Sequence, residues 1–421
     1  MVSALIFSFV IGHPDVLASG ATDRDARLLY ADLEQGPENA WITIWGENIS
    51  ENAEFNCGGD PCEPYSFELD PHHPENIGQA ARYKLVFRTS GPVELVGGNT
   101  MPYEAVRGRI VEAEPPTIPR VSKGDIVYLR AGRYSHTTNC DGRKVLWCGN
   151  GQSGVSIIGY PGEKVVVDCS IGPFDLGTRR IKNLVIANIE MDCGGRGPGF
   201  SGARIGSREN VRIVGVYLHD AQPPGTGGFG AFSATRGLYL LGNHSLRTGR
   251  PGNHNSHAIY HGGRRENRDV VIAYNHIEQH EGGRAIQIYG HLPQESMSNL
   301  VIHHNYVHDF SGNAGILVSH TDGQQGPPNT RCWINDALVE KNIVIANGNR
   351  SGINIRGCDA NGDGGFYVRK NIVAGAPIQI DFGDASVVVE SNCLDRAPVG
   401  SYSGNGNQLD YPECAGVLTD D

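Results

Sequence analysis

An asparagine recurs at the same place in a short apolar phrase along most of this chain. The phrase is clearest in DVVIAYNHIEQ (269–279), NLVIHHNYVHD (299–309) and FYVRKNIVAG (366–375). A unit that returns at intervals of roughly 20–50 residues is typical of solenoid proteins, in which each repeat packs on its neighbours. The alignment predicts one column of corner residues, namely Asn188, Asn243, Asn275, Asn305, Asn342, Asn371 and Asn392, with Gly215 in the equivalent place in residues 210–220.

Each phrase begins with a strand of about five residues in which apolar and polar side chains alternate, and a period of two predicts β-structure. A second apolar phrase follows most corners, as in HAIYHGG (257–263) and RAIQIYG (284–290). Because an asparagine amide bonds readily to nearby backbone groups, stacked coils would place one asparagine above the next. Two or three strands in each coil around an aliphatic interior make a parallel β-helix. The predicted inward column is Ile259, Ile286, Ile316, Ile353 and Ile378.

The segments GDIVYLRAGRYS (124–135) and GVSIIGYPGEKVVVDCS (154–170) resemble the first coils of the pectate-lyase-like superfamily. The resemblance implies a right-handed parallel β-helix, and we assign residues 116–421 to this catalytic domain. It implies less about chemistry, because the fold hosts lyases, hydrolases, epimerases and adhesins.

Residues 22–115 do not share the repeat and are expected to form a separate small domain. AWITIWGENIS (40–50), YKLVFRT (83–89) and GPVELVGGN (91–99) read as strands separated by turns. The turn WGEN (45–48) resembles the hallmark turn of immunoglobulin-like IPT/TIG domains, which implies a β-sandwich. We expect this domain to cap the end of the solenoid, where an edge strand needs cover, or to act as a spacer.

The 10 cysteines form five pairs that are close in sequence. An even number of paired cysteines favours disulfides in an oxidising compartment over buried free thiols. The predicted disulfides are Cys57–Cys62, Cys140–Cys148, Cys169–Cys193, Cys332–Cys358 and Cys393–Cys414.

The start of the chain is apolar over VSALIFSFVIG (2–12) and offers small residues for cleavage in LASGA (17–21). Residues 1–21 are therefore expected to be a signal peptide, although they lack a basic first segment. No other stretch reaches the roughly 20 apolar residues that span a bilayer. We expect a secreted or periplasmic protein with no membrane span. The net charge of −11 argues against nucleic acid as a partner.

Histidine is concentrated in the middle of the chain, where 11 of the 16 histidines lie between residues 244 and 320. Several arginines share this stretch. A basic, imidazole-rich region within an acidic protein suits the binding of a polyanion. The alternative is that these histidines are exposed hydrogen-bonding groups of loops and corners.

Alignment of the second apolar phrases predicts which outward residues lie side by side. It places His257 beside Arg284, Tyr260 beside Gln287, and Gly262 beside Tyr289. Neighbouring strands are about 4.8 Å apart, so these groups would form one polar face instead of a plain solvated sheet. We expect this face to be a sugar-binding groove with Gln287, Tyr289, His291, His320 and Arg356 as substrate-binding residues.

Cleavage of a uronate-containing polymer by β-elimination is the chemistry that this groove suits. The reaction needs a cation beside the carboxylate, a base for the C5 proton and an acid for the leaving oxygen. Arg284 or Arg356 would supply the cation, His257 or His261 the base, and Tyr260 or Tyr289 the acid. The expected catalytic set is His257, Tyr260, His261 and Arg284.

The loop CDANGDGG (358–365) is the candidate metal site. Asp359, Asn361 and Asp363 match the beginning of a calcium-binding loop, but Lys370 stands where an EF-hand has glutamate. Calcium is therefore a candidate cofactor, and an ordinary turn is the alternative.

Two other functions remain open. A glycoside hydrolase would use carboxylic acids drawn from Asp322, Asp359, Asp381 and Asp384. A non-catalytic adhesin or carbohydrate-binding solenoid would need no acid or base. The expected enzyme is a polysaccharide lyase that acts as a monomer on an acidic polysaccharide such as alginate or pectin.

Overall fold

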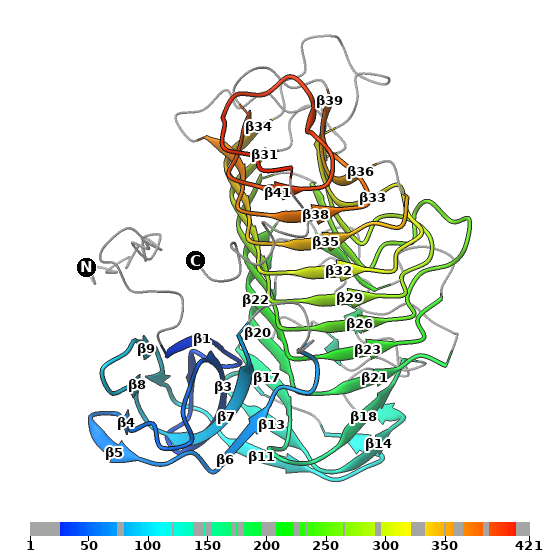
Figure 1. Cartoon of the computed structure of the whole chain (residues 1–421). Helices are drawn as coiled ribbons and strands as arrows, with labels where there is room; N and C mark the ends of the chain where they lie inside the picture. The colour runs from blue at the N-terminus through cyan, green and yellow to red at the C-terminus, as the bar shows by residue number, and fades with distance from the viewer. Residues whose placement is uncertain are drawn as a thin grey trace, which may run out of the picture.

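The protein is all-β and consists of a long parallel β-helix with a small antiparallel β-sandwich beside it (Figure 1). The computed structural model describes residues 26–73, 80–119, 122–137, 147–148, 154–169, 174–175, 181–194, 208–222, 228–232, 235–263, 266–290, 296–320, 333–348, 351–356, 365–381 and 387–409. The predicted right-handed parallel β-helix is confirmed. In this part of the chain there is no helix long and apolar enough to cross a membrane.

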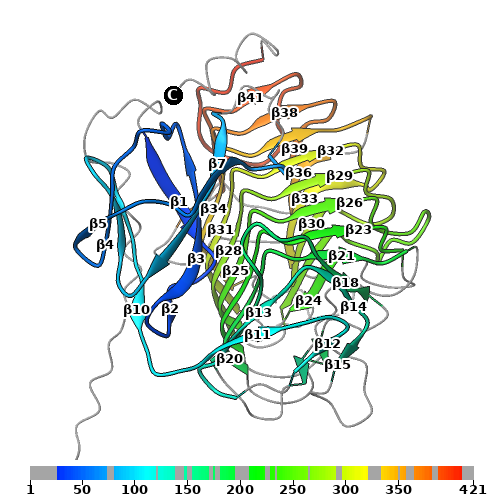
Figure 2. The same cartoon turned by 90° about the horizontal axis from the view of Figure 1, so that it is seen from below.

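Three parallel sheets run along the solenoid, and each coil contributes a strand to them in turn (Figure 2). The 11-stranded sheet contains β11 (Ile110–Ala113), β13 (Ile126–Leu129), β17 (Val155–Gly159), β20 (Ile181–Ala187), β22 (Arg208–Val214), β25 (Thr235–Leu241), β28 (Glu266–Ala273), β31 (Ser296–His303), β34 (Trp333–Glu340), β37 (Phe366–Arg369) and β40 (Val387–Glu390). The 10-stranded sheet contains β14 (Gly132–Tyr134), β18 (Val165–Asp168), β21 (Glu190–Asp192), β23 (Tyr217–His219), β26 (His244–Leu246), β29 (His276–Glu278), β32 (Tyr306–His308), β35 (Ile343–Ile345), β38 (Ile372–Ala374) and β41 (Cys393–Leu394).

The third sheet of the solenoid is shorter. Its seven strands are β24 (Phe229–Phe232), β27 (Ile259–Gly263), β30 (Ile286–Gly290), β33 (Ala314–His320), β36 (Ser351–Arg356), β39 (Ile378–Asp381) and β42 (Val399–Gly400). Two further pairs lie near the first coils, formed by β12 (Thr117–Ile118) with β15 (His136–Thr137) and by β16 (Trp147–Cys148) with β19 (Phe174–Asp175).

Aliphatic columns fill the interior of the solenoid, because alternate residues of every strand point inward. The predicted isoleucine column is confirmed, since Ile259, Ile286, Ile316, Ile353 and Ile378 pair in register and belong to one core cluster. This continuous core makes the spacing of the outward residues as regular as that of the inward ones.

A ladder of buried asparagine amides marks the corner between the 11-stranded and 10-stranded sheets. Each amide donates to the carboxamide oxygen of the asparagine in the next coil, as Asn275 does to Asn305 at 2.9 Å. The ladder runs unbroken through Asn243, Asn275, Asn305, Asn342, Asn371, Asn392 and Asn407. The predicted corner column is therefore confirmed from Asn243 onward, and Asn407 extends it.

The placement of Asn188 and Gly215 in that ladder was wrong. Both lie one residue earlier, in the left-handed backbone position (φ 54° and 60°) that Tyr274 and His304 occupy in later coils. Ile189 and Val216 fill the ladder place in these early coils, because the strands that follow, β21 and β23, pair in register with β26. The Asn188 amide instead donates to Asp32 of the sandwich at 2.9 Å.

The sandwich consists of two four-stranded antiparallel sheets. One contains β1 (Arg27–Ala31), β3 (Ala40–Glu47), β7 (Arg82–Thr89) and β6 (Ser66–Leu69), and the other contains β5 (Asp60–Cys62), β4 (Phe55–Cys57), β8 (Val93–Leu95) and β9 (Thr100–Met101). A short parallel pair, β2 (Gln35–Gly36) with β10 (Glu104–Ala105), lies beside them.

The sandwich packs along the side of the solenoid, so the expected end cap was wrong (Figure 2). It shares one buried cluster with outward side chains of six neighbouring strands of the 11-stranded sheet, from β13 to β28. These side chains are Ile126, Tyr128, Ile158, Val185, Ala187, Val214, Leu241 and Ala273. At this contact the buried Arg82–Asp70 ion pair (2.7 Å) also reaches the backbone oxygen of Tyr274 at 3.2 Å. The physical reason is that this face of the sheet is apolar and needs cover along its length.

Two of the predicted disulfides are confirmed. Cys57–Cys62 closes the β4–β5 turn, and Cys169–Cys193 joins neighbouring coils after β18 and β21. Cys393 is also disulfide-bonded, while its predicted partner Cys414 lies outside the described residues. Cys140, Cys332, Cys358 and the side chain of Cys148 lie outside them as well.

Candidate functional site

The outer face of the seven-stranded sheet carries the predicted polar groove, and its predicted register is confirmed. Tyr260 pairs with Gln287, and Gly262 pairs with Tyr289. Further along, Tyr289 pairs with Ser319, Ser319 pairs with Arg356, and Arg356 pairs with Asp381. The outward residues of five neighbouring strands therefore form one continuous surface.

A pocket of about 180 Å³ opens on this surface. It is lined by Arg284, Asn313, Ala314, Leu317, Ser351, Asn354, Arg356, Gln379 and Asp381. Its Asp381 carboxylate accepts hydrogen bonds from Gln379 at 2.7 Å and from Asn354 at 3.3 Å. Two arginines and a carboxylate thus meet in a single pocket, and they come from β36, β39 and the turn before β30.

The electrostatics of the pocket favour an anion. Burial lowers the pKa of Arg284, and the Arg356 cation lowers it further against an opposing effect of Tyr289. Two acceptor atoms of the same sheet, Asn354 Oδ1 in the pocket and Gln287 Oε1 on β30, are buried without a hydrogen-bond partner among the described residues. A ligand that carries both negative charge and hydroxyl donors would satisfy the cations and the acceptors together.

His257 contacts the pocket residue Arg284 and is 3% exposed. Its Nδ1 atom accepts a hydrogen bond from the backbone N–H of Arg284 at 3.0 Å. Burial, followed by the Arg284 cation, lowers the pKa of His257 to about 3, so the imidazole is neutral near pH 7. These contacts suit a residue that positions Arg284. They suit the role of catalytic base, which we expected for His257, less well.

His261 lies away from the groove, inside the solenoid. It is fully buried and pairs in register with Ile288, which belongs to the aliphatic core. Because His261 follows Ile259 by two residues, strand alternation directs both side chains inward.

The other predicted site residues fall into two groups, those on the groove face and those outside the described residues. Tyr260 and Tyr289 are half-buried on the groove face. His291 and the calcium-loop residues Asp359, Asn361 and Asp363 lie outside the described residues, as does the side chain of His320.

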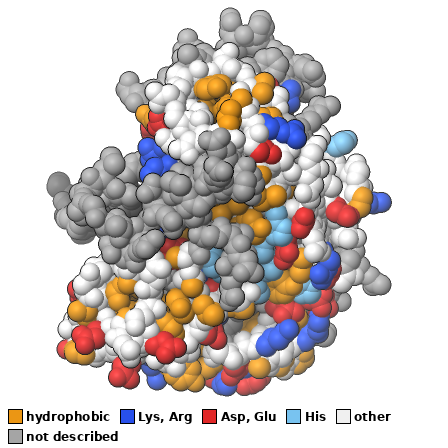
Figure 3. All heavy atoms as spheres, viewed as in Figure 1, with side chains coloured by type: hydrophobic (Ala, Val, Ile, Leu, Met, Phe, Trp, Pro, Cys, Tyr) orange, Lys and Arg blue, Asp and Glu red, His pale blue; other side chains and the backbone are white. Residues whose placement is uncertain are grey.

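A second polar face, which the sequence analysis did not single out, lies on the 10-stranded sheet. Histidines gather on it in the middle of the molecule, over β23, β26, β29 and β32 (Figure 3). The residues one and three places after each ladder asparagine point outward here, so the ladder spacing was the signal that could have found this face. Its aromatic side chains are His72, Tyr217, His219, His244, His276, Tyr306 and His308.

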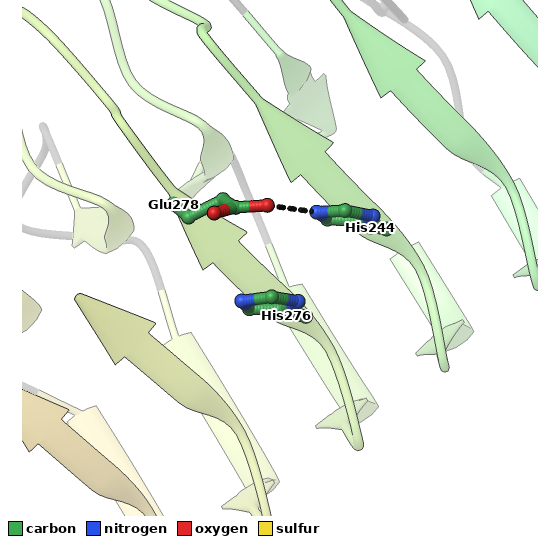
Figure 4. A group of neighbouring side chains, drawn as sticks. All are labelled: His244, His276 and Glu278. Carbon is green, nitrogen blue, oxygen red and sulfur yellow. Dashed lines mark hydrogen bonds and ion pairs between the residues drawn. The ribbon is translucent and has the colours of Figure 1, made fainter. Parts of the chain in front are cut away.

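The imidazoles of this face stack and share one carboxylate. The rings of His244 and His276 are parallel, with centroids 4.5 Å apart, and His244 Nε2 lies 2.8 Å from Glu278 Oε1 (Figure 4). The hydrogen bond to His244 is the main cause that lowers the pKa of Glu278. Burial, followed by the nearby His244, lowers the pKa of His276 to about 3. The face therefore combines a carboxylate with a neutral imidazole.

A larger hollow of about 560 Å³ lies at the corner beyond β26, β29 and β32. Its arginine, Arg247, is already paired with Asp220 at 2.6 Å, and Glu281 and Asp309 line the same space. This hollow therefore has less positive charge available to bind an anionic ligand than the groove has.

No protein-family model, no curated protein and no solved structure matches this chain.

Proposed function

We propose that the groove on the seven-stranded sheet binds uronate residues of an acidic polysaccharide and cleaves the chain by β-elimination. The observation that carries this proposal is the convergence of Arg284 and Arg356 in one pocket beside unpaired buried acceptors. A carboxylate placed between the arginines would relieve their mutual repulsion.

The arginines would neutralise the uronate carboxylate and so acidify the proton on the adjacent carbon, C5. Tyr289 is the candidate base, because it lies on the groove face close enough to interact electrostatically with Arg284. The base would take the C5 proton, a carbon–carbon double bond would form, and the C4–oxygen bond would break.

Tyr260 is the candidate acid for the leaving oxygen. Its hydroxyl lies over Gly262, the strand partner of Tyr289. The two phenols therefore belong to neighbouring strands. This arrangement would let one of them act on each side of the scissile bond. His257 holds the Arg284 backbone in this scheme, and His261 has no part in it.

Glycoside hydrolysis is the alternative on this scaffold, and it generally uses two carboxyl groups. Asp381 is the only carboxylate among the described residues that line the pocket. Asp322, Asp359 and Asp384 lie outside the described residues. The arginine pair thus favours elimination, and product analysis separates the two reactions.

We further propose that the chain is a secreted monomer related to the pectate-lyase-like superfamily, with an IPT/TIG-like sandwich and a calcium ion at the 358–365 loop. The disulfides support an oxidising compartment. Activity measured with and without a calcium chelator tests whether the ion takes part.

The test is a screen of pectate, alginate and other acidic polysaccharides, followed by ultraviolet absorbance of unsaturated uronate ends. We expect Arg284→Gln and Arg356→Gln each to lower kcat/KM by about 100-fold or more, because each removes a preorganised cation. Arg236→Gln is the matched control, since this exposed arginine pairs with Glu266 on another sheet.

New reducing ends without the absorbance would replace elimination with hydrolysis. Binding to a polymer without cleavage would indicate an adhesin. Full activity in both groove variants would show that the groove is not the active site.

A further inference from the structure

We propose that the outer face of the 10-stranded sheet holds one divalent transition-metal ion of the zinc, cobalt or nickel type. Its ligands would be Glu278 and the imidazoles of His244, His276 and His308. The site lies on a different sheet from the groove, so the inference is independent of the proposed polysaccharide chemistry.

The ligand atoms already lie close together. His276 Nε2 is 2.9 Å from His308 Nε2, which is 3.9 Å from Glu278 Oε2. The other carboxylate oxygen of Glu278 is 2.8 Å from His244 Nε2. His244, His276 and Glu278 each offer an atom within 4.8 Å of the others (Figure 4). Tetrahedral zinc with bonds of about 2.0–2.1 Å places its ligand atoms roughly 3.3 Å apart, so small side-chain rotations would close the set.

The second nitrogen of His308 and that of His244 each have a contact that orients the ring. His308 Nδ1 lies 2.9 Å from Asp309 Oδ2, which is the arrangement that fixes the tautomer of many metal-bound histidines. His244 Nδ1 lies 3.0 Å from His72 Nδ1. The Nε2 atoms of these two rings are thereby left to contact Glu278, and His276 Nε2 lies beside His308 Nε2.

The local charge also favours a cation. No arginine or lysine of the described residues forms an ion pair with Glu278 or Asp309, whose charged partners are histidines. Asp220 nearby is neutralised by Arg247 instead. A divalent ion would compensate the two remaining carboxylates. Imidazole donors select zinc, cobalt or nickel over calcium, which prefers oxygen ligands.

The site lies beside a contact between the sandwich and the solenoid. His72 belongs to the segment after β6 in the sandwich, and its ring stacks on Tyr217 and contacts His244. His244 and His276 are each 8% exposed, and Glu278 is half-buried, so the site lies just beneath the surface.

The test is titration of the metal-free full chain with Zn²⁺ by calorimetry and with Co²⁺ by visible absorption. We expect one ion per chain and the intense cobalt bands of a four- or five-coordinate site. His276→Gln and His308→Gln should each weaken binding at least about 100-fold, because each removes a direct ligand. Asp309→Asn should weaken it about 10- to 100-fold by loosening His308.

His254→Gln is the matched control, because His254 is an exposed loop histidine outside this face. It should bind as the unmodified protein does. If a histidine variant fails to fold, Glu278→Gln and Asp309→Asn carry the test, since both side chains are partly solvent-exposed. Binding of less than one ion per chain, or equal affinity in His276→Gln, His308→Gln and His254→Gln, would overturn the proposal.

Discussion

At the scale of single residues, the ladder amides form several hydrogen bonds each, and all of them except the terminal Asn407 are buried. Asn305 donates to the backbone oxygen of Ile272 at 2.8 Å and to Asn342, and it accepts from both nitrogens of Asn275. Asn305→Ala would leave several of these groups unpaired. We expect a loss of about 2–4 kcal/mol in the free energy of unfolding, measured by denaturant titration.

The last rung supplies the control for that prediction. Asn407 is half-buried and ends the ladder, so water can replace its contacts. Asn407→Ala should cost less than about 1 kcal/mol. Equal losses at the two positions would mean that the ladder contributes no more inside the solenoid than at its end.

A second residue-scale prediction concerns pH. Burial lowers the pKa of His257 to about 3, whereas the unfolded chain binds this proton near pH 6.5. The neutral folded form therefore contributes its full stability above about pH 6.5, and this contribution is lost as pH falls from there toward pH 3. At pH 5 the loss is about 2 kcal/mol.

Unfolding free energies measured between pH 7 and pH 4 check this prediction. His257→Gln keeps an acceptor for the Arg284 N–H but binds no proton, so its pH slope should be shallower by about one proton. Unchanged slopes would show that His257 titrates alike in both states.

At the scale of elements, the contact between sandwich and solenoid depends on a glycine at one coil corner. Gly242 has φ 59°, and a Cβ atom there would overlap the Tyr30 hydroxyl. Tyr30 itself stacks on Trp45, with ring centroids 4.9 Å apart. Gly242→Ala should lower the free energy of unfolding by about 3 kcal/mol, through strain and through displacement of Tyr30.

Gly252→Ala separates the two causes. Gly252 has φ 74°, and nothing lies within 4 Å of an added Cβ atom. The free energy of unfolding of this variant should fall by only about 1 kcal/mol, which is the part of the effect that comes from backbone strain. Similar melting temperatures for the two variants would exclude a packing role for Tyr30.

At the scale of the whole molecule, the sandwich and the solenoid strands from β13 to β28 share one buried apolar cluster. The buried Arg82–Asp70 pair and the Asn188–Asp32 bond add polar links across the same contact. We therefore expect one thermal transition in calorimetry, with fluorescence of the sandwich tryptophans following circular dichroism of the solenoid. Gly242→Ala should begin to separate the unfolding of the sandwich from the unfolding of the solenoid. Two transitions in the unmodified protein would contradict a shared core.

Much of the fold and of the groove register could be predicted, because both follow from local periodicity. A period of two directs Ile259 and Ile286 inward, and equal spacing then places Tyr260 beside Gln287. The same rule would have excluded His261, which shares the parity of Ile259. Asn188 was misplaced because an asparagine that accepts a left-handed backbone looks like a ladder asparagine one position away.

The sequence by itself determined the coil, its inward columns, the amide ladder and the row of outward groups in the groove, because these depend on spacing within each repeat. Only the tertiary structure decided where the sandwich lies, how deeply His257 is buried, and that His72 reaches His244. Those features join segments as far apart as residues 72 and 244, and no periodicity connects them. They follow from which apolar surfaces need cover and which polar groups then meet at the contact.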